Sequence, residues 1–158
     1  MTGSRATVFR RDGGRRPRRT SPPRPARHDA ATWGLFPEWD ATYLNYSGGH
    51  DYRVCHQATY QVPENQAFWS ITVYGNDGFM KSENSNVNSS NVKLNADGTF
   101  TVFFGSLETC GEVPNRLDTT AGWNFLMRIY RPGKSVLEGL INFRRPNPCS
   151  EPLLQREA

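Results

Sequence analysis

Residues 67–78 read AFWSITVYGNDG, a run of aromatic and β-branched side chains that ends at a glycine-containing turn. Side chains of this kind pack well on a pleated sheet, so the run predicts a buried strand. Its alternation defines two faces, and the more apolar one, which we expect to face the core, carries Trp69, Ile71 and Val73. The opposite face carries Phe68, Ser70, Thr72 and Tyr74.

Short patterned runs of this kind recur between turns rich in Gly, Asn, Asp and Pro. We predict strands over residues 52–62, 68–74, 92–95, 99–104 and 124–130. A polar loop is predicted over 82–91 and irregular backbone over 107–122, while 136–141 fits either an edge strand or a turn of helix. No segment keeps a helical period over three turns. About six to eight short strands predict an all-β fold, either a β-sandwich or a barrel.

Alternation also separates two faces in the other long strands. In residues 99–104, we expect the face that carries Phe100, Val102 and Phe104 to point into the core. In residues 52–62, one face carries Tyr52, Val54, His56, Ala58, Tyr60 and Val62. In residues 124–130, Phe125, Met127 and Ile129 lie opposite Leu126, Arg128 and Tyr130.

The N-terminal segment differs in composition from the rest of the chain. Residues 1–28 hold nine arginines and one acid, Asp12, and carry +8, whereas the remaining residues carry −4. After Met1, the segment has only Val8 and Phe9 as large apolar side chains, so it cannot bury enough surface to offset its ordering entropy. We therefore predict a disordered Arg/Pro-rich tail over 1–32, a β-sandwich domain over 33–150 and a C-terminal tail over 151–158.

Two other interpretations of the basic segment stay open, a basic arm for an anionic surface or nucleic acid and an incorrectly assigned start codon. We do not expect the folded part to bind nucleic acid, because the basic charge belongs to the tail. No apolar run approaches the roughly 18 residues of a membrane span, and the tail lacks the apolar stretch of a signal peptide. We therefore expect a soluble chain without an export signal, and the sequence defines no compartment.

Three cysteines, Cys55, Cys110 and Cys149, are widely spaced and form no CxxC or Cys/His cluster. The odd number argues against a full disulfide framework, so we expect three thiols, with a single bridge as the alternative. The three histidines are too few to form a metal cluster with these spacings, and the Asn/Asp turns lack EF-hand spacing. We therefore expect no metal and no cofactor.

Several motifs follow one another in a fixed order over about residues 50–146. They are Phe68-Trp69-Ser70 with Thr72 and Tyr74, then Asp97-Gly98, then Asn115, then Arg128, Tyr130 and Pro132, and finally Val136-Leu137-x-Gly139. This order resembles the domain of unknown function 1214 family. The resemblance implies a jelly-roll-type antiparallel β-sandwich that usually follows a domain of unknown function 1254 in longer proteins. This chain would then be a short or partial member, with a domain of the 1254 type or a second copy of itself as its partner.

One loop departs from the family pattern. Where many members read Asn-Trp-Leu-Pro, this chain reads Asn115-Arg116-Leu117-Asp118. A site that depends on the aromatic residue of that loop is therefore not expected here.

The sequence contains no clear catalytic constellation, so the catalytic residues stay unknown. His50 and Asp51 could join Ser70 in a hydrolase, but Ser70 lacks the G-x-S-x-G nucleophile elbow. His56 falls on a strand face among tyrosines, where a structural histidine is the commoner role. We expect that the chain alone is not an enzyme.

Aromatic and asparagine side chains offer a possible carbohydrate or small-ligand site. Candidate stacking residues are Tyr43, Tyr46, Tyr52, Trp69 and Trp123, although aromatic side chains more commonly fill the core of a sandwich.

Arg128 is the most informative charge because a strand-interior arginine needs a partner when buried. We expect it to pair with Glu112, Asp118 or carbonyls of the 112–120 loop. The alternative is a ligand clamp in a polar pocket with Tyr130 and Asn115.

Two functions follow from these observations. The first is a non-catalytic β-sandwich module that binds a ligand or assembles with a partner. The second is the C-terminal fragment of a two-domain enzyme, for example a hydrolase, whose active site needs residues of an N-terminal domain.

Overall fold

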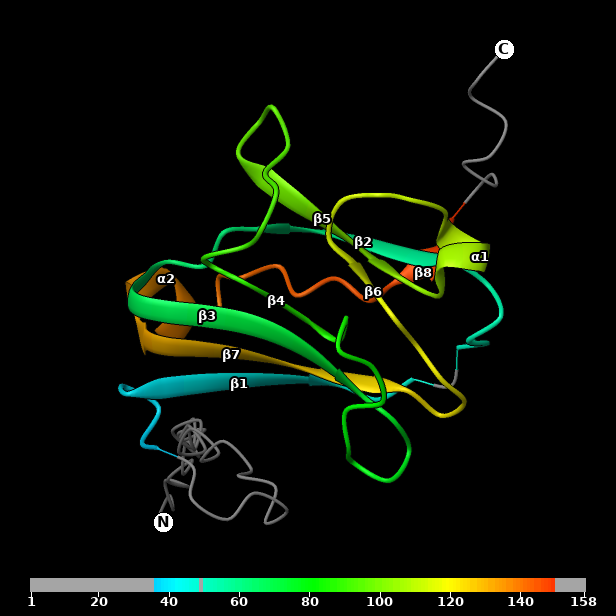
Figure 1. The fold of residues 1–158 in the computed structure, drawn as a ribbon. Coiled ribbons are helices and arrows are strands. Elements are labelled where there is room, and N and C mark those ends of the chain that lie inside the picture. The colour runs from blue at the N-terminus through cyan, green and yellow to red at the C-terminus, as the bar shows by residue number, and fades with distance from the viewer. Residues whose placement is uncertain (1–35, 49, 150–158) are drawn as a thin grey trace, which may run out of the picture. The chain divides into compact units, whose positions relative to one another are not determined.

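The computed structural model describes residues 36–48 and 50–149, in which eight strands form two four-stranded sheets (Figure 1). The first sheet contains, in spatial order, β1 (Ala41–Tyr46), β7 (Asn124–Pro132), β3 (Asn65–Tyr74) and β4 (Asn86–Asn88). The second contains β6 (Arg116–Leu117), β5 (Thr99–Phe104), β2 (His56–Gln61) and β8 (Asn147–Pro148). Two single-turn helices are α1 (Leu107–Cys110) and α2 (Lys134–Leu137). The predicted all-β sandwich is confirmed.

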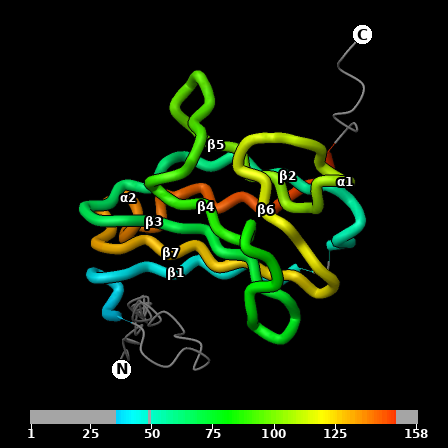
Figure 2. The backbone as a smooth tube through the Cα atoms, in the orientation of Figure 1, coloured from blue at the N-terminus to red at the C-terminus, as the bar shows by residue number. Residues whose placement is uncertain are grey.

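Pairing between strands is antiparallel except for the short parallel pair β5–β6. The two sheets form separate layers, as the backbone trace shows (Figure 2). The long strands β3 and β7 form the centre of the first sheet, and their register places Ile71 opposite Met127. Because directly paired residues point to the same side, this register fixes which side chains of both strands share a face.

The core lies between the two sheets. From the first sheet, Trp69, Ile71, Val73, Phe125, Met127 and Ile129 are at most 3% exposed. From the second sheet, Phe100, Val102 and Phe104 are fully buried. The predicted core faces of β3 and β5 are confirmed, and the core face of β7 is the one opposite Arg128.

Several element boundaries differ from the sequence prediction. β2 begins only at His56, because residues 52–54 form a turn in which the Val54 amide donates to the Asp51 carbonyl. β4 lies inside the predicted polar loop, where Val87 faces the core between two asparagines, and the predicted strand 92–95 is absent. The region predicted to be irregular contains α1 and β6, and α2 occupies the start of 136–141.

The prediction of three thiols was wrong. Cys55 and Cys110 form a disulfide across 55 residues of sequence, with their Cα atoms 5.0 Å apart. Within the described part of the chain, Cys149 is the free cysteine. Topology explains the pairing, because the residue before β2 and the last residue of α1 meet at one end of the second sheet.

The predicted tails, residues 1–32 and 151–158, lie outside the described residues. Within the described ranges, no helix has the length and apolar character needed to cross a membrane.

Candidate functional site

The outer face of the first sheet, which points away from the second sheet, brings together polar and aromatic side chains from all four strands. Cross-strand pairing places Arg128 between Tyr43 of β1 and Ser70 of β3, and Ser70 opposite Asn88 of β4. Since the odd-numbered residues 69–73 and 125–129 fill the core, the even-numbered residues between them point outward. Arg128 therefore lies near the middle of this outer face.

Two neutral hydroxyl groups hold the half-buried guanidinium of Arg128. Its Nη2 donates to the Tyr74 hydroxyl at 2.6 Å, and its Nη1 donates to Thr72 Oγ1 at 3.3 Å. The guanidinium carbon also lies 5.6 Å from the centre of the Tyr74 ring, within cation–π range. A guanidinium has five N–H groups, so these contacts leave donors available for a further acceptor.

The prediction that Arg128 pairs with the 112–120 loop was wrong. None of the four ion pairs between described residues includes Arg128. Asp118, one of the expected partners, pairs with Arg116 and accepts a 2.5 Å hydrogen bond from the Ser82 hydroxyl. The reason is topological, because β6 carries this loop into the second sheet, whereas Arg128 projects from the outer face of the first.

The Asp118 carboxylate is stabilised in its charged form. Burial alone raises the pKa of this carboxyl, but the hydrogen bonds from Ser82 and Arg116 outweigh burial and lower the pKa below its ordinary value. This carboxylate is thus already satisfied and is not available to neutralise Arg128.

Asparagine side chains extend the polar contacts of Arg128 to the edge strand. Asn86 Nδ2 donates to Thr72 Oγ1 at 2.8 Å and to the Ile71 carbonyl at 3.2 Å, and Asn88 Nδ2 donates to Asn86 Oδ1 at 2.9 Å. Thr72 is thereby fixed from one side by Asn86 and from the other by Arg128. We refer to this cluster as the Arg128 face, which consists of Arg128, Thr72, Tyr74, Asn86 and Asn88.

Tyr130 shares the outer face with Arg128, two residues further along β7. Its ring packs against Phe68 of β3, with the ring centres 5.9 Å apart. Phe68 is 37% exposed, so this aromatic pair leaves apolar surface accessible beside the Arg128 face.

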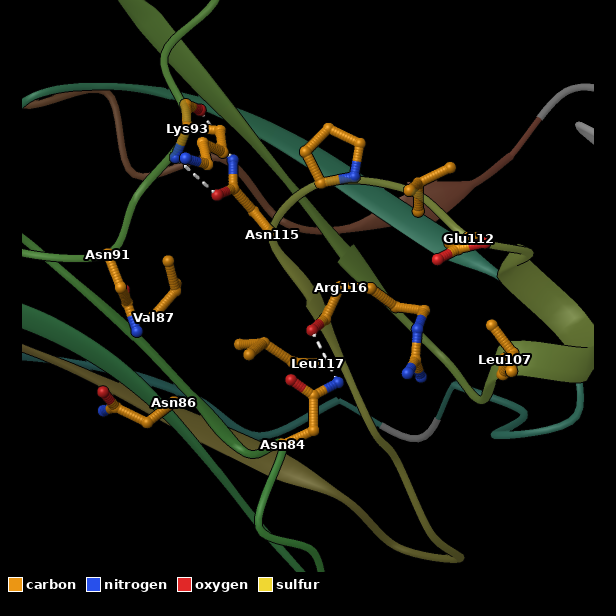
Figure 3. A pocket seen from close by; sticks show the side chains of 12 residues that line it. Asn84, Asn86, Val87, Asn91, Lys93, Leu107, Glu112, Asn115, Arg116 and Leu117 are labelled. Carbon is orange, nitrogen blue, oxygen red and sulfur yellow. Dashed lines mark hydrogen bonds between the residues drawn. The ribbon is translucent and has the colours of Figure 1, made fainter.

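Asn115 does not join this cluster. Its side-chain amide donates to the Lys93 carbonyl at 2.8 Å, and its Oδ1 accepts from the Lys93 amide at 2.8 Å (Figure 3). The same amide also donates to the Thr101 carbonyl at 2.9 Å. It lines a groove of about 560 Å³ between the segment around β4 and the segment around β6. Its hydrogen bonds are those of a residue that fixes this loop to β5.

Trp69 and Trp123 lie in the core, at 1% and 2% exposure. Trp69 stacks on Phe100 and Trp123 stacks on Phe104, with ring centres 4.6 and 5.2 Å apart. Tyr46 is also buried, whereas Tyr43 lies on the outer face and Tyr52 in a loop. The structure does not bring the five candidate aromatic residues together on one surface.

The residues considered for hydrolase chemistry are also apart. His56 is 3% exposed, stacks on His50 at 4.5 Å between ring centres, and has a pKa lowered by burial. Asp51 forms an ion pair with Arg53, and Ser70 lies on the outer face of the other sheet. These side chains do not form a triad.

Sequence reasoning missed the contacts of Thr72, Tyr74, Asn86 and Asn88 with Arg128 or with one another. The two-residue alternation of side chains in 68–74 placed Thr72 and Tyr74 on the face opposite the core. This was the only sequence signal for their contacts with Arg128. The register between β3 and β7, which joins them to Arg128, has no local sequence marker.

Comparisons with known proteins agree with this fold. The crystal structure of the VPA0106 protein from Vibrio parahaemolyticus is similar, with a TM-score of 0.61, 22% identity, and coverage of 75% of this chain and 32% of that one. A putative uncharacterized protein from Burkholderia cenocepacia gives a TM-score of 0.53 at 17% identity, covering 69% of this chain and 29% of that one. The chain thus spans about a third of the length of these proteins.

A search of the curated proteins found no match. The family model described as "Protein of unknown function (DUF1214)" matches residues 36–134, which include β1 to β7 and the whole Arg128 face. The chain belongs to the DUF1214 family.

Proposed function

We propose that this chain is a non-catalytic binding module and that its Arg128 face binds an anionic group of a ligand. The observation that carries the proposal is the guanidinium of Arg128, which is half-buried and whose hydrogen-bond partners among the described residues are two hydroxyl groups. A charge in this position lacks the carboxylate that normally compensates a partly buried arginine.

The chemistry of the surrounding groups favours a planar or tetrahedral oxyanion. A guanidinium presents parallel N–H donors that match carboxylate and phosphate oxygens. Tyr74 accepts a hydrogen bond from Arg128, so its own hydroxyl proton remains free to donate to the same anion. The hydroxyl groups orient the guanidinium without neutralising its charge.

The size of the relatives favours a second candidate, in which this chain is one part of an enzyme with a site shared between domains. The chain covers only 32% and 29% of the two solved structures. The anion at the Arg128 face would then be a substrate group or a carboxylate of a further domain, for example one of the 1254 type. In a longer family member, replacing the aligned arginine would weaken domain association, seen as separate unfolding transitions.

The test of the first candidate is ligand-induced stabilisation. The melting temperature of the chain is measured with increasing sodium phosphate or sodium acetate, against sodium chloride at constant ionic strength, which controls for screening. Phosphate should stabilise the wild-type chain and Arg53→Gln, a control that removes the same charge from an exposed ion pair. Arg128→Gln should lose that stabilisation, and equal stabilisation of all three proteins would contradict the proposal.

A further inference from the structure

A free thiol lies in contact with the disulfide at one end of the second sheet. The Sγ of Cys149 is 3.1 Å from the Sγ of Cys55, which is itself bonded to Cys110. The Cys149 amide also donates to the Cys55 carbonyl at 2.9 Å, next to the β2–β8 pairing of His56 with Pro148. Backbone contacts therefore hold Cys149 beside the disulfide.

The other end of the disulfide is also held in place. Cys110 is 2% exposed, and its amide donates to the Ser106 carbonyl at 3.0 Å. A Cβ atom at Gly105 would lie only 2.6 Å from the Cys110 Sγ, so the missing side chain of this glycine makes room for the sulfur. Contacts other than the disulfide therefore also hold Cys110 in this position.

We propose that Cys55 exchanges its disulfide partner between Cys110 and Cys149. The Cys149 thiol first loses its proton to water, and the resulting thiolate attacks the Sγ of Cys55. The Cys149–Cys55 bond forms while the Cys55–Cys110 bond breaks, and Cys110 leaves as a thiolate that takes a proton from water. The number of disulfides and thiols is unchanged, so the step needs no oxidant or reductant.

The two disulfides tie the start of the inner strand β2 to different segments, since the strand order of the second sheet is β6-β5-β2-β8. With Cys110 as partner, the start of β2 is tied to α1, and Leu107 of α1 lines the groove beside β6. With Cys149 as partner, the start of β2 is tied to the end of the two-residue strand β8, and α1 loses its covalent link. Exchange would thus remove the covalent link of the helix that borders the groove and add one to the C-terminal strand instead.

Tryptic peptides separate the three cysteines, which makes the exchange measurable in the wild-type chain. Cys55 falls in residues 54–81, Cys110 in 94–116 and Cys149 in 145–156. The oxidised full chain is incubated without added thiol, quenched in acid, denatured, alkylated and digested, and the alkylated cysteine is identified by mass spectrometry. We expect two populations, one alkylated at Cys149 and one alkylated at Cys110.

Dilution and substitution complete the test. A first-order rate constant for the appearance of alkylated Cys110 that stays constant on tenfold dilution indicates intramolecular exchange, whereas a rate constant that falls on dilution would contradict the proposal. Alkylation of Cys149 alone would also overturn it. In Cys110→Ser exposed to dissolved oxygen as the oxidant, we expect Cys55 and Cys149 to form a disulfide, and two free thiols in a folded variant after this treatment would count against the proposal.

Discussion

Arg128 donates a 2.6 Å hydrogen bond to the hydroxyl of Tyr74, and the guanidinium carbon lies 5.6 Å from the centre of the same ring. The two residues come from the adjacent strands β7 and β3 and share the outer face of the first sheet. This contact orients a cation and leaves its charge uncompensated by any described carboxylate. It is the structural basis of the proposed anion site.

Removing the Tyr74 hydroxyl should weaken both the fold and the anion site. We expect Tyr74→Phe to lower the free energy of unfolding by about 1 kcal/mol, because a hydrogen bond to a charged group is lost at a half-buried position. Phosphate-induced stabilisation should also decrease. Tyr130→Phe, on the same face, is the control and should change neither quantity, as measured by urea denaturation with and without phosphate.

Because Ile71 and Ser70 lie on opposite faces of β3, their replacement by alanine should change the free energy of unfolding by very different amounts. Ile71→Ala should lower the free energy of unfolding by about 2–5 kcal/mol, since Ile71 is fully buried between the sheets. Ser70→Ala should cost far less, because Ser70, although only 4% exposed, loses a single hydroxyl and no apolar side chain. Urea denaturation of both variants checks this, and a larger loss for Ser70→Ala would mean that the core face has been misassigned.

The pKa of Asp118 predicts a pH-dependent contribution to stability. Its pKa is lowered in the folded state, because hydrogen bonds from Ser82 and Arg116 outweigh burial. A lowered folded pKa stabilises the fold above the unfolded value of 3.8, and that stabilisation is lost as the pH falls through the folded pKa. Asp118→Asn should therefore destabilise the chain by about 1–3 kcal/mol at pH 7 and by less near pH 3.

Glu112→Gln is the matched control for Asp118, since Glu112 lies in the same loop and takes part in no ion pair between described residues. Its effect on the urea midpoint should be small at both pH values. A loss of stability in Asp118→Asn that is as large at pH 3 as at pH 7 would argue against the ion pair as its source.

Asn115 should affect stability and not anion binding. The residue has a φ of 54°, a left-handed conformation that alanine disfavours, and its side chain makes three hydrogen bonds. Asn115→Gly accommodates the backbone but removes those bonds, and we expect a loss of about 1–3 kcal/mol. Phosphate should still raise its melting temperature by the wild-type amount, and a selective loss of that response would place Asn115 in the binding site.

The core faces of the strands could be predicted from the sequence because the large apolar side chains that fill the core recur at every second residue. Trp69, Ile71 and Val73 show this directly, and Phe100, Val102 and Phe104 show it in the facing sheet. β4 was missed because two asparagines flank its single core residue, so the strand carries no apolar pattern.

The candidate site could be predicted only in part. Arg128 and Tyr130 were candidate ligand-binding residues because they share one face of the predicted strand 124–130. The structure places both on the outer face of the first sheet. The Tyr74 contact depends on the register between strands more than 50 residues apart in sequence, which no local pattern encodes. The disulfide was missed for the same reason, since the ends of separate segments bring Cys55 and Cys110 together.

The most direct test of the proposed anion site is the NMR signal of the Arg128 Nε–Hε group during titration of the chain with sodium phosphate at constant ionic strength. The spectrum of Arg128→Lys assigns the resonance by its disappearance, and Arg53 serves as an internal reference in an exposed ion pair. We expect the Arg128 signal to shift in a saturable way while the Arg53 signal moves little. A linear, unsaturated shift of equal size for both arginines would contradict the account.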